Sequence, residues 1–110
     1  MGNLKVFENE QFGQVRVVEK DGESWFVATD ICKALGLNAS LAINGRKDRK
    51  KSGLDDDEKG IANVNTPGGE LEMTVINEAG MYSLILKSRK KEVGKSILLL
   101  MKETDKPDTF

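Results

Sequence analysis

Short runs in which apolar and polar residues alternate predict β-strands in the first quarter of the chain. Residues 15–18 and 24–27 are rich in Val, Trp and Phe and have the length of strands. Asp21-Gly22 between them is a typical hairpin turn. Residues 4–7 add a candidate third strand, so we expect an N-terminal antiparallel sheet.

A second hairpin is predicted by residues 61–65 and 70–76, which flank the turn sequence Thr66-Pro67-Gly68-Gly69. Pro67 presets a negative φ and Gly68 accepts a positive φ, as a type II turn requires. The second of these strands alternates most regularly. We expect one buried and one exposed face, with Leu71, Met73 and Val75 on the buried side.

The period then changes to that of helices between the two hairpins. We expect Thr29 to cap a first helix that ends at Gly36, and Asn38 to cap a second. The second helix is predicted to run through Leu41 and Ala42 into the basic residues that follow. Gly45 within it costs about 1 kcal/mol relative to Ala and weakens its continuity.

Two closing helices complete the predicted fold. Asn77 is placed to cap the first, with Ile76 and Met81 as a hydrophobic staple. The last helix begins at residue 88–90 and carries one apolar face, formed by Val93, Ile97, Leu100 and Met101. The fold class is therefore α+β, with a single domain over residues 1–103 and a polar C-terminal tail over residues 104–110.

Charge is unevenly distributed over the 110 residues, although the formal net charge is only −1. Residues 46–51 hold five basic residues and one acidic residue, and residues 87–95 repeat that count. Residues 55–58 are all acidic. A near-neutral total thus conceals two basic blocks and one acidic block.

Catalytic chemistry has few candidate residues. The chain contains no His, and Cys32 is its single Cys, so a thiolate zinc site cannot form within one chain. The acidic block lacks the ligand spacing of a calcium-binding loop and reads as solvated. We therefore expect no enzyme activity, no cofactor and no metal. Cys32 suits a buried structural position and a cytoplasmic protein, and no segment has the apolar length of a membrane span.

The segment from 28 to 47, which reads ATDICKALGLNASLAINGRK, has the pattern of a helix-turn-helix. Small Cys32 permits a close helix crossing, and the second hairpin can act as a wing. The second helix would present polar and basic side chains that contact base edges and phosphates in other proteins. These candidate DNA contacts are Ser40, Asn44, Arg46, Lys47, Arg49, Lys50 and Lys51. A plain helical corner with solvated charges has the same pattern.

The second basic block lies where a helix is predicted to start, and cations are unfavourable there. Its residues are candidates for phosphate contacts, or form a solvated patch. They are Lys87, Arg89, Lys90 and Lys91.

Three separated blocks resemble the N-terminal domain of the Bro family. The first comprises VRVV at 15–18 and DGESWFVATDICKALGL at 21–37; the second, LDDDEKG at 54–60 and NTPGG at 65–69; the third, TVINEAGMYSLILKSRK at 74–90. The family occurs in phage and prophage antirepressors and in large DNA viruses of insects. The resemblance implies DNA binding and control of phage gene expression. The chain departs from the family at VGKSILLLM (93–101), where the family usually has a Phe- and Trp-containing helix.

Two functions follow as hypotheses. The first is a transcriptional regulatory module that binds double-stranded DNA. The second is a protein-interaction module that occupies a phage repressor without contacting DNA, with the acidic residues 55–58 mimicking DNA charge. The apolar run at 97–101 also predicts a homodimer through the last helix.

Overall fold

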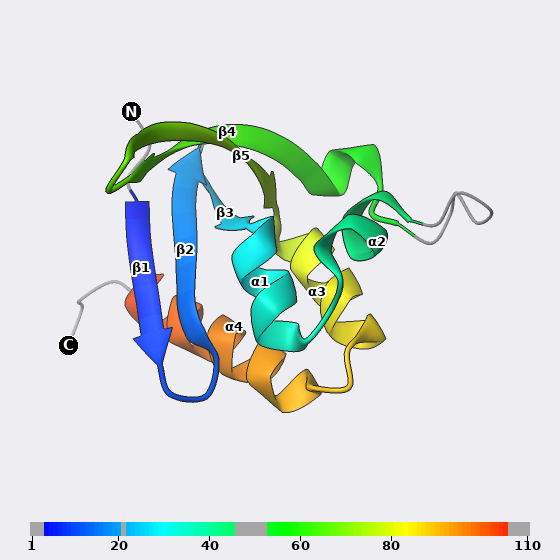
Figure 1. The fold of residues 1–110 in the computed structure, drawn as a ribbon. Helices are drawn as coiled ribbons and strands as arrows, with labels where there is room; N and C mark the ends of the chain where they lie inside the picture. Colours follow the sequence, from blue (N-terminus) through cyan, green and yellow to red (C-terminus); the bar gives the residue numbers. More distant parts are fainter. Residues whose placement is uncertain (1–3, 21, 46–52, 106–110) are drawn as a thin grey trace.

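The computed structural model describes residues 4–20, 22–45 and 53–105, with only the backbone described for 100–105 (Figure 1). Strands and helices follow the order that the hydrophobic pattern predicts. The elements are β1 (Leu4–Asn9), β2 (Gly13–Lys20), β3 (Glu23–Val27), α1 (Ala28–Leu35), α2 (Ala39–Asn44), the 3-10 turn η2 (Asp56–Glu58), β4 (Lys59–Thr66), β5 (Gly69–Ile76), α3 (Glu78–Lys87) and α4 (Lys91–Asp105).

The two predicted hairpins form one antiparallel sheet of five strands, in the order β1-β2-β3-β5-β4. They join where β3 pairs with β5, through Phe26↔Ile76 and Val27↔Val75. In Figure 1 the β4–β5 hairpin arches over the upper ends of the other strands, while the helices lie below it. The α+β class is confirmed, and the hairpin that the sequence offers as a possible wing is part of the sheet.

Both faces of the sheet bury side chains. On the helical side, Val15, Val17, Phe26 and Ile76 join the main core with residues of all four helices. On the other side lies a smaller cluster, formed by Val18, Val27, Val64 and Val75. This explains why residues 15–18 show so little alternation, because alternate residues are buried in different clusters.

The helix pair differs from its prediction at both outer ends. α1 begins at Ala28 with Val27 as N-cap, so Thr29 lies inside the first turn and does not cap. Val27 is fully buried as the last residue of β3, and this burial sets the start of the helix. α2 ends at Asn44, because Gly45 adopts φ 78° and ψ 178°, outside the helical region. The prediction that α2 continues into the basic block is therefore wrong.

The inner ends of the pair follow the prediction. Gly36 takes a left-handed φ of 70° and donates its N–H to the last carbonyls of α1. Asn38 caps α2 by accepting the Leu41 N–H at 3.1 Å. Asn77 caps α3 in the same way, through the Gly80 N–H at 2.9 Å.

The sequence predicts the positive φ of the β4–β5 turn at Gly68. The structure has it at Gly69, with φ 118°. The pair Thr66↔Gly69 closes directly around Pro67 and Gly68, so the unusual backbone falls on the first residue of β5.

The last helix extends to Asp105, two residues past the predicted boundary of the domain. Of its apolar run, Ile97 and Leu98 are buried in the core, whereas Leu99 is 61% exposed. Among side chains that the structure describes, the prediction of a homodimer through this run therefore depends on Leu99.

Candidate nucleic-acid interface and the adjoining groove

The described residues on either side of the first basic block lie close together. Its members Arg46, Lys47, Arg49, Lys50 and Lys51 lie outside the described residues. The flanking residues are in contact. The Leu54 N–H donates to the Ile43 carbonyl at 2.9 Å, and a Cβ on Gly53 would lie 2.6 Å from the Asn44 carbonyl carbon. Five cations are therefore attached within a few residues of the C-terminal end of α2.

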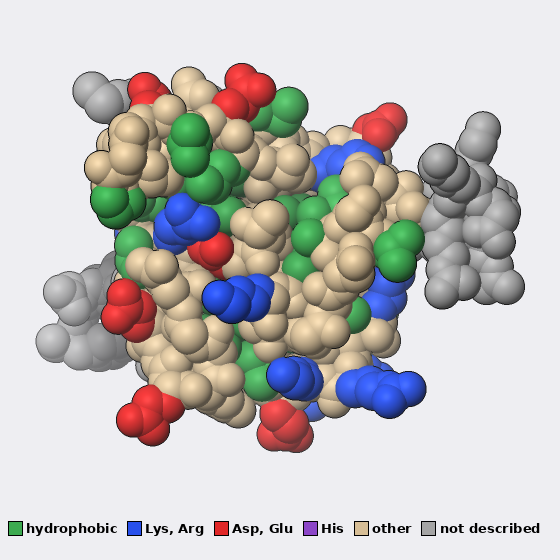
Figure 2. Space-filling view, viewed as in Figure 1, with side chains coloured by type: hydrophobic (Ala, Val, Ile, Leu, Met, Phe, Trp, Pro, Cys, Tyr) green, Lys and Arg blue, Asp and Glu red, His purple; other side chains and the backbone are tan. Residues whose placement is uncertain are grey.

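The second basic block surrounds the turn between α3 and α4. Lys87 ends α3, Lys91 begins α4, and Arg89 and Lys90 lie between them; all four are exposed. In Figure 2, Lys and Arg side chains gather at the lower right of the molecule, where Figure 1 places this turn. Lys91 lies at the positive end of a helix dipole, so an anion nearby would offset unfavourable charge.

Ser88 joins this turn to the helix pair, although nothing in its local sequence indicates that role. Its side chain is almost fully buried. The hydroxyl donates to the Leu35 carbonyl at 2.7 Å and accepts the Lys90 N–H at 2.8 Å. A Cβ on Gly36 would lie 3.4 Å from Lys90 Cε, so the Lys90 side chain passes over the end of α1. The second basic block therefore adjoins the turn that leads into α2.

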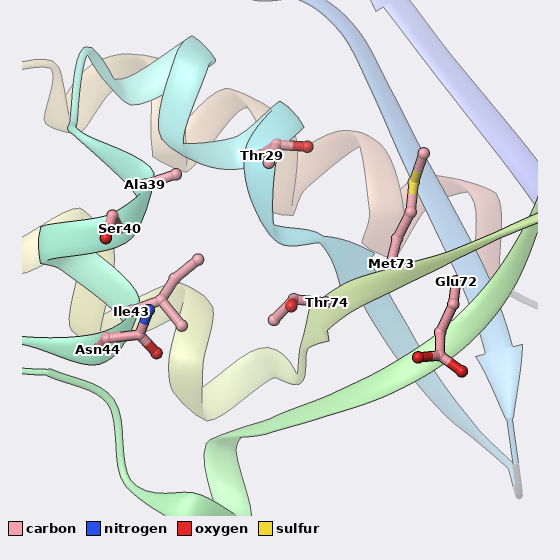
Figure 3. Close-up of a pocket in the computed structure, with 8 residues that line it drawn as sticks. All are labelled: Thr29, Ala39, Ser40, Ile43, Asn44, Glu72, Met73 and Thr74. Carbon is pink, nitrogen blue, oxygen red and sulfur yellow. The ribbon is translucent and has the colours of Figure 1, made fainter.

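Ser40 and Asn44 lie four residues apart on α2 and line a groove between this helix and β5 (Figure 3). The groove has a volume of about 390 Å³. Its other lining residues are Thr29 and Ala39, Ile43 of α2, and Glu72, Met73 and Thr74 of β5. The two predicted base contacts are therefore brought together, but beside a carboxylate that repels phosphate.

The acidic residues 55–58 form a hydrogen-bonded 3-10 turn that contacts α3. Asp55 and Glu58 form a reciprocal capping box around η2. Glu58 also accepts a hydrogen bond from the Ser83 hydroxyl at 3.0 Å, and Asn77 Nδ2 donates to the Asp57 carbonyl at 2.8 Å. Within the described residues, no group of three or more His, Cys, Asp or Glu is placed to hold a metal ion.

An ion pair that sequence reasoning missed fastens α1 to the sheet. Arg16 of β2 makes two side-chain hydrogen bonds to Asp30, from Nε at 2.8 Å and Nη2 at 3.0 Å. The Arg16 backbone N–H adds a third, at 3.0 Å. The hydrogen bond with Asp30 raises the pKa of Arg16 above its usual value. The two residues are 14 apart in sequence, and nothing in the sequence distinguishes them from ordinary surface charges.

Cys32 is 1% exposed in the helical core. Burial raises the pKa of its thiol to about 11, because the surroundings disfavour a thiolate. Since the thiolate is the reactive form, Cys32 is a packing residue and not a nucleophile.

Comparison with known proteins identifies a family and a relative that this chain resembles in sequence. Residues 14–103 match the family model described as the BRO family, N-terminal domain. An uncharacterized protein of Haemophilus influenzae is 42% identical over 82 residues, which are 71% of the chain. The chain spans 36% of that relative's length. No solved structure matches the chain. None of the helices in the described residues is long and apolar enough to cross a membrane.

Proposed function

The chain belongs to the BRO family, through a match to that family's N-terminal domain. On that basis we propose that it is a DNA-binding regulatory module of the phage antirepressor type. The basic blocks are the proposed contacts with the DNA backbone. Lys and Arg supply most phosphate contacts in such complexes, which position the protein and give salt-dependent affinity.

The points at which the two blocks join the described fold support this function most directly. One is attached at the C-terminal end of α2, through the contact of Gly53 with Asn44. The other lies beside the turn that precedes α2, through the hydrogen bond of Ser88 with Leu35. Six helical residues span about 9 Å, which is comparable to the ~12 Å width of the DNA major groove. Cations at the two ends of α2 would thus contact phosphates on opposite sides of one groove.

Base reading is a separate part of the proposal. Ser40 and Asn44 remain predictions for this role, since both side chains are exposed on α2. Their groove also contains Glu72, so we assign the main binding free energy to the basic residues.

Fluorescence anisotropy with a labelled mixed-sequence duplex tests the proposal. If about six phosphates are neutralised, log K falls with log salt concentration at a slope near −5. We expect Arg89→Glu to weaken binding and to reduce the magnitude of this slope by about 1. Lys20→Glu, at the exposed end of β2, makes the same change in net charge and serves as the control. A slope near zero, or equal losses in both variants, would refute DNA binding through these blocks.

The alternative, a module that binds a repressor protein, is favoured by the net charge of −1 and by the exposed carboxylates of Asp56 and Asp57. Reversing both to Lys leaves the capping box of Asp55 and Glu58 in place. Under this alternative, that double variant loses the partner, whereas Arg46→Glu with Lys47→Glu retains it. The proposed function predicts that only the second pair of changes abolishes DNA binding.

A further inference from the structure

β5 is paired on one side along its whole length but on the other side only at its end. Every residue of β5 pairs with β4. β3 pairs only with Val75 and Ile76, because the chain turns into α1 immediately after Val27. Within the described part of the chain, residues 70–74 therefore have a strand edge without a neighbouring strand. Such an edge directs backbone N–H and C=O groups outward, which is a template for another strand.

The groove described above follows part of this edge, at residues 72–74. Figure 3 shows α2 facing β5, with Thr74 directed toward the helix. Buried Ile43 and half-buried Ala39 supply apolar contacts, whereas Ser40 and Asn44 are exposed beside them. A strand edge opposite a helix thus offers backbone hydrogen bonds on one side and side-chain contacts on the other.

The dimensions and charge of the groove favour one kind of occupant. Its volume of about 390 Å³ lies within the ~300–1,000 Å³ of known ligand sites. A strand rises about 3.3 Å per residue, so the edge from 70 to 74 accommodates roughly five residues. Glu72 is the one charged residue among those that line the groove, and it selects against nucleic acid and for a cation.

We propose that the groove between α2 and β5 binds an extended peptide segment of a partner protein, which adds as a strand to residues 70–74 and places a Lys or Arg against Glu72. In strand addition, main-chain hydrogen bonds supply affinity and the side-chain contacts supply specificity. None of the residues that line the groove belongs to either basic block, although Ser40 and Asn44 are also the candidate base contacts.

The first test is a selection of random heptapeptides against the intact chain. We expect enrichment of peptides with Lys or Arg at a constant position. A labelled selected peptide should then bind Glu72→Lys at least about tenfold more weakly, since the substitution replaces attraction by repulsion. Glu8→Lys is the matched control, because Glu8 is exposed on β1, outside both residues 70–74 and the groove; it should bind within about twofold of the unaltered chain.

A second pair of variants tests the location. Ser40→Trp fills the groove and should abolish peptide binding, whereas Leu41→Trp places the same side chain at a neighbouring position of α2 outside the lining and should not. Circular dichroism of each variant confirms that the fold is retained.

Backbone pairing is tested on the peptide itself. Methylating its backbone nitrogens one at a time should abolish binding at alternate positions only, because alternate N–H groups of an added strand face β5. Failure to enrich any peptide, equal losses for the two Glu variants, or tolerance of every N-methyl group overturns the proposal. A dimer in sedimentation that Ser40→Trp dissociates would also overturn it, since a second copy would then be the occupant.

Discussion

Replacing Ser88 by Ala removes one hydroxyl that holds two turns together. The hydroxyl makes hydrogen bonds of 2.7 Å to the Leu35 carbonyl and 2.8 Å to the Lys90 N–H, at a site that is 3% exposed. Each bond contributes about 1 kcal/mol net, and a buried carbonyl left without its donor costs about 1–3 kcal/mol. We therefore expect Ser88→Ala to lower the free energy of unfolding by about 2–4 kcal/mol.

Urea unfolding followed by the fluorescence of Trp25, the single Trp of the chain, measures this loss. With an m-value of about 1–3 kcal/mol/M, the unfolding midpoint should fall by roughly 1–2 M. Ser96→Ala is the control, because its hydroxyl donates only to the Glu92 carbonyl of its own helix at 3.0 Å, near the surface. That variant should shift the midpoint by less than about 0.3 M. Equal midpoints for the two variants would refute the reasoning that Ser88 links the α3–α4 turn to α1.

Three further predictions concern packing, an ion pair and a thiol. A Cβ on Gly94 would lie 2.4 Å from Ile85 Cγ1. Gly94→Ala should therefore lower the free energy of unfolding in urea by about 1–3 kcal/mol, although Ala has the higher helix propensity. In an Ile85→Ala background the same change should cost nothing; an unchanged cost would contradict overpacking. Asp30→Asn should cost about 1–3 kcal/mol by weakening the hydrogen bonds from Arg16, and an equally large cost in an Arg16→Met background, which keeps only the backbone N–H bond, would count against the side-chain pair. Because the Cys32 pKa is raised to about 11, its thiol ionises first in the unfolded chain. The unfolding midpoint should therefore fall between about pH 8 and about pH 10 by more than in Cys32→Ala, and parallel decreases would exclude the effect.

Local chemistry was sufficient to predict most elements. The caps at Asn38 and Asn77, and the stop at Gly36, depend on hydrogen bonds within four residues along the chain. Such contacts form in the same way whatever surrounds them, so the sequence predicts them reliably. The errors were of another kind. Thr29 was expected to cap α1, but burial of Val27 at the end of β3 set the helix start two residues earlier than a cap at Thr29 allows.

The candidate DNA interface was predictable only as two separate basic blocks. The second block adjoins the turn before α2 because Ser88 reaches Leu35 across 53 residues, and the residue that follows the first block, Gly53, contacts the end of α2. Neither contact has a local sequence signal, because a buried Ser or a small residue at a close approach looks like any other until the chain is folded.

The sequence by itself determined the order of the strands and helices, the absence of His with a single Cys, and the resemblance that led to the BRO family. Tertiary structure alone decided that the two hairpins share one sheet, through the pairing of β3 with β5 across about 50 residues. It also decided that β3 stops early, which leaves the edge of β5 facing α2 and creates the groove that contains Glu72. The physical reason is that periodicity reports which face of an element is buried, whereas the partner of that face is selected by long-range packing.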